Sequence, residues 1–147
     1  MICLAETEYG EVTYPGIGHF TTKDFWDPLY RPIVFLPQSP QKINTRFLLH
    51  TRKNLNSAQY LVVGDHQSMK SSFFDGKKPT KFIVHGFIDN QLFGEWMRHM
   101  KDEFLMADDY NVVLVDWSHG NFFPYGQVFN SILAWLFYLN YYDLGCC

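Results

Sequence analysis

Short apolar runs separated by polar segments are the main pattern between residues 45 and 117. Residues 45–51 (TRFLLHT) and 59–63 (QYLVV) are two such runs, and the polar turn segment between them favours an antiparallel hairpin. Residues 64–80 are polar and predict a surface loop. The pattern therefore predicts a strand pair at the front of a larger sheet.

A strand, a helix and a second strand are predicted after that loop. Residues 81–85 (KFIVH) form a strand candidate, and residues 111–115 (NVVLV) are a β-branched run typical of a strand buried on both faces. The segment between them is amphipathic at helical spacing. Its apolar face comprises Phe93, Trp96, Met97, Met100 and Phe104, and its polar face comprises Arg98, Lys101, Asp102 and Glu103. This order predicts a parallel βαβ unit with a right-handed crossover, and hence an α/β fold.

The two ends of the chain carry weaker patterns. Residues 1–40 are rich in glycine and proline without a sustained period, which predicts an irregular arm packed over the domain. Residues 125–139 are a candidate second helix. At 147 residues, 47% of them hydrophobic, the chain is long enough for one sizeable core, so residues 1–147 are expected to be part or all of one domain.

Composition argues against some partners. A formal charge of -3 gives no positive field that would gather phosphates, so no nucleic-acid partner is expected. The longest apolar run, residues 132–139, is far shorter than the roughly 20 residues of a membrane span, so no transmembrane segment is predicted. The aromatic content of 18% is high and fits either a large aromatic core or an apolar surface for a ligand, a lipid or another part of the chain.

The stretch KFIVHGFID (residues 81–89) carries the clearest candidate chemistry, because a predicted buried strand ends there in His85, Gly86 and Phe87. Acyl transfer produces an intermediate with negative charge on oxygen, and a backbone N–H at the end of such a strand can stabilise that charge. Gly86 would permit the tight turn that directs the N–H of Phe87. The alternative is an ordinary strand-to-loop turn in which the glycine supplies an unusual backbone angle.

Three segments in this order, SPQKINTRFLLHT, KFIVHGFID and VVLVDWSHG, closely resemble the start of the pancreatic-lipase family of α/β-hydrolases. The likeness runs from about Glu11 to Asn130 and includes RPIVFLPQSP and YGQVFN. It implies a partial α/β-hydrolase fold, with an N-terminal antiparallel hairpin followed by a parallel βαβ unit. It also implies that Phe87 supplies an oxyanion-hole N–H, with His85 and Gly86 shaping the loop.

The resemblance assigns further roles and absences. Trp96 would lie on the helix that packs against the KFIVH strand, and Asp116 and Trp117 would close the next strand as structural residues. The family's nucleophile elbow (Gly-x-Ser-x-Gly), its acidic and histidine partners, the second oxyanion donor, the lid, the calcium-binding loop and the colipase-binding domain would all lie beyond Cys147. The expected fold is thus truncated before the nucleophile strand, with no cofactor in this segment.

Ser118 and the remaining histidines are weaker candidates. Gly120 follows Ser118 by two residues, but Asp116 stands where an elbow requires glycine, so we expect a loop serine that caps the following turn and not a nucleophile. The other histidines show neither an HExxH motif nor carboxylates at ligand spacing, so each is expected at the surface or in a loop and no metal site is predicted. These histidines are His19, His50, His66, His99 and His119.

Two features depart from the family pattern. The family closes a short N-terminal loop and the helix before the DW motif with disulfides, and this chain has Thr13 and His19, and Lys101 and Val112, at those positions. This removes direct support for an oxidising compartment. Residues 131–147 form a divergent tail, and the hypothesis for its origin is a truncated transcript, an unspliced intron or a gene-model error.

The resemblance favours the N-terminal segment of a secreted lipase that hydrolyses carboxylic esters of triacylglycerol or phospholipid at a lipid–water interface. Without the triad, the segment by itself is expected to be inactive. The alternatives are a non-catalytic lipase relative that binds lipid or a partner protein, and a truncated gene product without independent function. An open sheet edge where the nucleophile strand belongs also predicts self-association.

Overall fold

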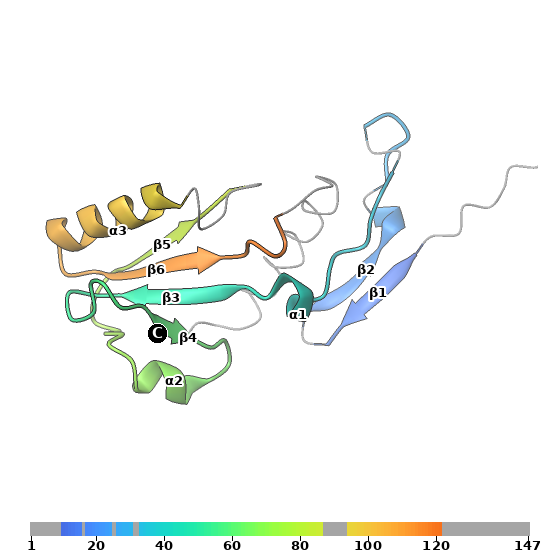
Figure 1. Cartoon of the computed structure of the whole chain (residues 1–147). Coiled ribbons are helices and arrows are strands. Elements are labelled where there is room, and N and C mark those ends of the chain that lie inside the picture. The colour runs from blue at the N-terminus through green and yellow to red at the C-terminus, as the bar shows by residue number, and fades with distance from the viewer. Residues whose placement is uncertain (1–9, 16, 25, 31–32, 87–93, 122–147) are drawn as a thin grey trace, which may run out of the picture.

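A computed structural model describes residues 10–15, 17–24, 26–30, 33–86 and 94–121, and its centre is a mixed sheet with strand order β4-β3-β6-β5 (Figure 1). Strand β3 (Arg46–His50) pairs antiparallel with both β4 (Gln59–Leu61) and β6 (Asn111–Asp116). Strand β5 (Thr80–Val84) pairs parallel with β6. The predicted antiparallel pair is therefore confirmed, and β5 and β6 are parallel as a βαβ unit requires.

Strand β6 occupies an interior position because both of its faces are apolar. All six of its residues are buried, and successive side chains point to opposite sides of the sheet. Val112 and Leu114 join a core cluster with Ile83, whereas Val113 and Val115 join a second cluster on the other side. The continuous β-branched run thus forms a strand covered on both faces, as its composition predicts.

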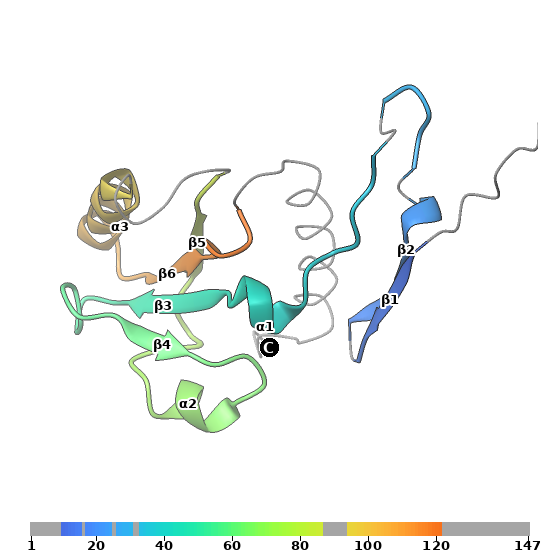
Figure 2. The same cartoon turned by 45° about the vertical axis from the view of Figure 1, so that its right-hand side comes forward.

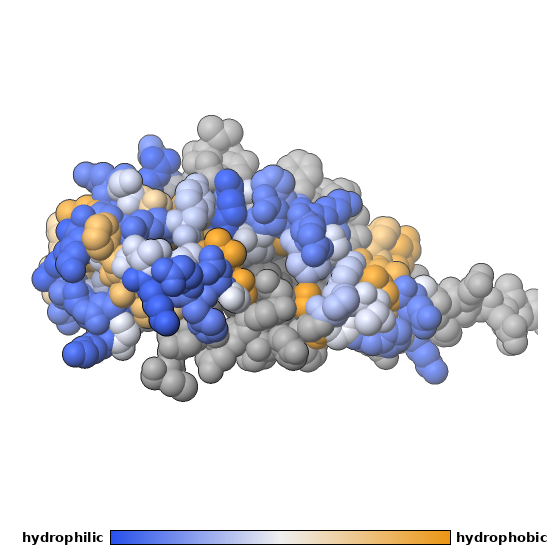
Figure 3. Space-filling view, turned by 90° about the horizontal axis from the view of Figure 1, so that it is seen from below, coloured by the Kyte–Doolittle hydropathy of each residue, from blue (hydrophilic) through white to orange (hydrophobic). Residues whose placement is uncertain are grey.

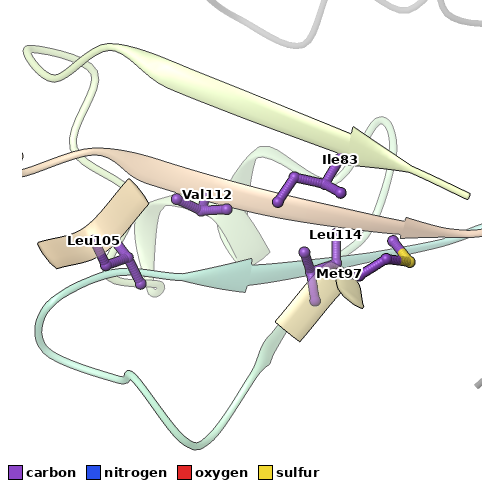
Figure 4. Packing of buried hydrophobic residues seen from close by; sticks show 5 residues of the cluster. All are labelled: Ile83, Met97, Leu105, Val112 and Leu114. Carbon is purple, nitrogen blue, oxygen red and sulfur yellow. The ribbon is translucent and has the colours of Figure 1, made fainter. Parts of the chain in front are cut away.

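Helix α3 (Glu95–Ala107) covers one face of the sheet, where Met97 and Leu105 pack on Ile83, Val112 and Leu114 (Figure 4). It connects β5 to β6, so strand, helix and strand follow in the predicted order.

The apolar face predicted for this helix is wrong in part. Trp96 and Met100, assigned to the packed face, are 40% and 42% exposed, whereas Lys101, assigned to solvent, is 4% exposed. The Lys101 ammonium donates to the carbonyl of Leu55 at 2.8 Å and forms an ion pair with Asp102. These polar partners let the lysine stem pack inside, and the buried face accordingly follows residues 97, 101 and 105.

The prediction of an irregular N-terminal arm is wrong for residues 11–24. Strands β1 (Glu11–Tyr14) and β2 (Gly18–Thr21) form an antiparallel hairpin, followed by the 3-10 turn η1 (Thr22–Asp24). The glycines and prolines suggested a loop, but Pro15 follows β1 directly at the hairpin turn and Gly18 begins β2. Figures 1 and 2 show the hairpin beyond α1 (Pro40–Ile43), at one end of the sheet.

The polar segment predicted as a loop contains the short helix α2 (His66–Lys70). Asp65 accepts hydrogen bonds from the backbone N–H groups of Gln67 and Ser68, so an Asx cap starts the helix. Figure 2 shows α2 and α3 on opposite sides of the sheet. Seen from the α2 side, hydrophobic residues form small groups among hydrophilic ones (Figure 3). Within the described residues, no helix combines the length and apolar character that crossing a bilayer requires.

His50 is buried at the end of β3, which contradicts its predicted place at the surface or in a loop. Its Nδ1 lies 3.1 Å from the carbonyl oxygen of Leu55. Burial lowers the pKa of His50 below 6.5, and the nearby Lys101 ammonium lowers this pKa further. The folded protein therefore resists protonation of a histidine that the unfolded chain protonates readily.

This pKa difference predicts a loss of stability in mild acid. The folded-state pKa of His50 is below its unfolded value, so His50 does not affect the free energy of unfolding well above pH 6.5. As the pH drops from about 6.5 toward the folded pKa, His50 lowers this free energy by at most about 1.4 kcal/mol per pH unit. Urea unfolding at about pH 7.5 and about pH 5.5 measures the change. His50→Gln should flatten this dependence, and the exposed His119→Gln control should retain it. An unchanged slope in His50→Gln would contradict the assignment.

Strand β5 has β6 on one side and no strand on its other side among the described residues. Phe82 and Val84 are 47% and 45% exposed on this strand. We predict concentration-dependent self-association along this edge, because unpaired backbone groups beside apolar side chains favour strand addition. Light scattering after gel filtration should show less association in Val84→Lys, whereas Met106→Lys on α3, 70% exposed, serves as the matched control. A monomer at all concentrations would contradict the prediction.

Candidate functional site

The residues singled out in the sequence lie where β5 and β6 end. Because the two strands are parallel, their carboxyl ends meet at the same edge of the sheet. His85 and Gly86 follow β5, while Asp116 ends β6 and Trp117 follows it. In open α/β sheets, ligands bind outside this edge.

His85 joins the two strand ends through its ring and its backbone. The residue is 6% exposed, and its Nε2 accepts the backbone N–H of Trp117 at 3.1 Å. This assigns the proton of the neutral ring to Nδ1, which lies 3.1 Å from the carbonyl oxygen of Gly86. The Trp117 indole in turn donates to the carbonyl of His85 at 2.8 Å, and the two rings stack with centroids 5.4 Å apart. The loop after β5 therefore starts from a fixed position.

Asp116 holds the end of β6. Its carboxylate forms an ion pair with Arg46, which is its direct cross-strand partner on β3. The same carboxylate accepts the backbone N–H of Ser118 at 3.0 Å. The turn that follows is closed by the N–H of Gly120, which donates to the carbonyl of Trp117 at 2.8 Å. Asp116 therefore caps the turn through its side chain, whereas Ser118 contributes a backbone N–H.

Asn121 is a member of this site that the sequence analysis missed. It is 2% exposed, and its Nδ2 donates to the carbonyl of Gly86 at 3.1 Å and lies 3.4 Å from Nδ1 of His85. Gly120 allows α1 to approach, because a Cβ at this position would lie 2.8 Å from Cγ2 of Ile43. No local pattern marks Asn121, since its partners precede it by 35 and 36 residues.

The structure places His85 and Gly86 at the predicted strand end, whereas Phe87 and Asp89 lie outside the described residues. Gly86 is not among the glycines with positive φ, which in the described part of the chain are Gly18 and Gly64. An added Cβ at Gly86 would meet nothing within 4 Å. Neither the φ angle of Gly86 nor the space around it therefore requires glycine at this position.

Comparison with known proteins identifies the fold to which these strand ends belong. The family model named Lipase matches residues 10–132, which is most of the chain. The chain belongs to the Lipase family. This membership implies the α/β-hydrolase fold, to which the mixed sheet and the parallel β5–β6 pair conform.

Several relatives of the chain are named as pancreatic lipases or pancreatic lipase-related proteins. The chain is 36% identical over 135 residues to Pancreatic lipase-related protein 2 of Myocastor coypus, covering 90% of the chain and 28% of that protein. It is 37% identical over 135 residues to Inactive pancreatic lipase-related protein 1 of Canis lupus familiaris, with the same coverage. Pancreatic triacylglycerol lipase of Equus caballus is 37% identical over 125 residues, which are 83% of the chain and 26% of that protein. The chain thus spans little more than a quarter of the length of each of these relatives.

The positions that the family resemblance assigns to disulfides carry polar or buried residues in this chain. Thr13 and His19 are directly paired across the β1–β2 hairpin, and Oγ1 of Thr13 lies 2.9 Å from Nδ1 of His19. Lys101 and Val112 are both buried, on α3 and β6, which pack together. A hydrogen bond therefore joins Thr13 and His19 at the positions where the family resemblance places a disulfide.

Metal binding has no structural support in the described part of this chain. No group of three or more histidine, cysteine, aspartate or glutamate side chains there could hold an ion. His99 is exposed on α3, as its position beside the polar helix face predicts.

Proposed function

We propose that this chain is the N-terminal part of a secreted lipase that hydrolyses carboxylic esters of triacylglycerol or phospholipid at a lipid–water interface. The observation that carries the proposal is the pair of hydrogen bonds between His85 and Trp117, which join the ends of β5 and β6 where the HGF motif begins. In this proposal the backbone N–H of Phe87 stabilises the oxyanion, and His85 and Gly86 shape the loop. Secretion and the lipid substrate are supported by membership of the Lipase family and by relatives named as pancreatic lipases.

The chemistry assigned to this segment is one half of an oxyanion hole. In ester hydrolysis a serine attacks the carbonyl carbon, and the carbonyl oxygen becomes an alkoxide that backbone N–H groups stabilise. The 147 residues contain no Gly-x-Ser-x-Gly elbow. We therefore propose that the chain alone does not hydrolyse esters. Hydrolysis of a short-chain ester by the purified chain, abolished by an active-serine reagent, would contradict this.

A chimera tests the proposal directly. Residues 10–132, the segment that the family model matches, replace the corresponding segment of coypu Pancreatic lipase-related protein 2. We expect the chimera to hydrolyse tributyrin emulsions, because the recipient would supply the serine elbow and its partners. The unmodified recipient is the control. A chimera that melts cooperatively and binds lipid without hydrolysing it would overturn the catalytic assignment.

That last outcome would favour the second candidate, a non-catalytic relative that binds lipid or a partner protein. A specific observation supports it: one of the similar proteins, 37% identical over 135 residues, is named Inactive pancreatic lipase-related protein 1. Ester turnover by the chimera separates the two candidates, since only the first requires it.

A further inference from the structure

Two hydrogen-bond donors converge on one carbonyl oxygen at the start of the loop after β5. The carbonyl of Gly86 lies 3.1 Å from Nδ1 of His85 and accepts a hydrogen bond from Nδ2 of Asn121, also at 3.1 Å. His85 is 6% exposed and Asn121 is 2% exposed, so both donors reach this oxygen from the buried side, although Gly86 itself is exposed. A carbonyl oxygen has two lone pairs, and both can be used here.

The direction of a carbonyl determines the direction of the N–H that follows it. A trans peptide group is planar, so the C=O of Gly86 and the N–H of residue 87 belong to one rigid unit and point in opposite directions. Fixing the oxygen therefore fixes the donor direction, whatever the side chain of residue 87 does. His85 and Asn121, which hold this oxygen, both belong to the described residues.

We propose that Asn121 is a positioning residue for the oxyanion donor and acts with His85 by holding the Gly86 carbonyl. This inference rests on the proposed function, because it assumes that the N–H of Phe87 meets the developing charge. A donor held in place before the reaction does not have to reorganise when the charge appears, which is the main source of stabilisation in such sites. Donors on the carbonyl also polarise the peptide group and strengthen its N–H as a donor.

The surroundings of Asn121 suit this role. The turn before it is closed by the Gly120–Trp117 backbone hydrogen bond, and Gly120 packs closely against Ile43 of α1. The amide of Asn121 is therefore presented from a fixed backbone. Its NH2 group, and not its oxygen, must face Gly86, because two carbonyl-type oxygens at this distance would repel each other.

The sequence offers a selective probe of this peptide group. Gly86–Phe87 is the one Gly-Phe pair in the 147 residues, so labelling with 1-13C-glycine and 15N-phenylalanine leaves a single carbonyl–amide correlation in an HNCO spectrum. Magic-angle spinning records the same 13C–15N correlation if the chain associates. We expect Asn121→Asp to move the 15N signal upfield, because a carboxylate cannot donate to the Gly86 carbonyl.

Asn111→Asp is the matched control. Asn111 is 0% exposed at the opposite end of β6, and its amide donates to the carbonyl of Asp75 at 2.8 Å, away from Gly86. The control thus also removes a buried asparagine amide donor, but at the end of β6 away from Gly86. Its Gly86–Phe87 signal should stay in place. Equal displacement in both variants, or none in Asn121→Asp, would overturn the positioning role.

Kinetics in the chimera give the second readout. Asn121→Asp should lower kcat by about 10- to 100-fold with little change in KM, while Asn111→Asp should leave kcat near that of the parent chimera. An equal loss of kcat in both variants would overturn the proposal. A parent chimera that hydrolyses no ester would refute the proposed function, and the amide signal would then still show whether Asn121 holds the Gly86–Phe87 peptide group. An active chimera with an unmoved signal would refute the positioning role alone.

Discussion

Replacing Phe87 by proline in the chimera is expected to lower kcat for ester hydrolysis by about 100- to 1,000-fold and to leave KM nearly unchanged. Proline has no backbone N–H, so the substitution deletes the proposed donor itself. KM should hardly change because the ground-state ester carbonyl carries little charge, and the lost interaction belongs to the transition state. Initial rates against tributyrin concentration, with melting curves for both proteins, provide the measurement.

Phe87→Leu is the matched control for the proline variant. It changes the side chain but keeps the N–H, so kcat should remain within about 3-fold of the kcat of the parent chimera. If Phe87→Leu loses as much activity as Phe87→Pro, the side chain and not the amide matters, and the oxyanion assignment fails. Equal melting temperatures would exclude unfolding as the cause of any loss.

The order of β3, β4, β5, α3 and β6 was predictable because each of them follows from a local pattern. The runs that became β3, β5 and β6 are continuous and apolar, and the helix between the last two has an amphipathic period. The pairing of β3 with β6 was not predictable in the same way. It joins residues about 65 positions apart, such as Leu48 and Leu114, and no turn between them specifies the register.

Errors in the prediction arose where polar residues occupy unusual places. Lys101 was assigned to solvent by its charge, but the carbonyl of Leu55 gives its ammonium a partner inside the fold. His50 is buried for a similar reason, with its ring at the same carbonyl. Leu55 lies in a loop that the sequence identifies only as polar. Partners of this kind become visible only when the loop is placed in three dimensions.

Only part of the candidate site could be predicted from the sequence. His85 and Gly86 adjoin a recognisable strand, so a local motif marks them. Asn121 follows a turn and has no such mark, although it supplies a hydrogen bond to Gly86. Its role depends on two parallel strands ending at one edge, which is a property of the sheet and not of either segment.

The Arg46–Asp116 pair shows how much of this edge depends on one carboxylate. Replacing Asp116 by alanine is expected to lower the free energy of unfolding by about 3 to 5 kcal/mol. Asp116 has a side chain only 10% exposed, and it accepts from both Arg46 and the backbone N–H of Ser118. Its loss would leave the Arg46 guanidinium, about two-thirds covered, without this counter-ion and the following turn without its cap. Urea unfolding followed by tryptophan fluorescence measures the change.

A paired replacement distinguishes loss of the ion pair from loss of the fold. The double variant Arg46→Met, Asp116→Asn removes both charges and keeps similar volumes, so it should be more stable than Asp116→Ala alone. Asp109→Asn, which breaks the more exposed Asp109–Lys78 pair, should change stability far less. If Asp116→Ala costs less than about 1 kcal/mol, the pair behaves like a surface salt bridge. The ends of β5 and β6 would then owe their position to the contacts of His85 and Trp117.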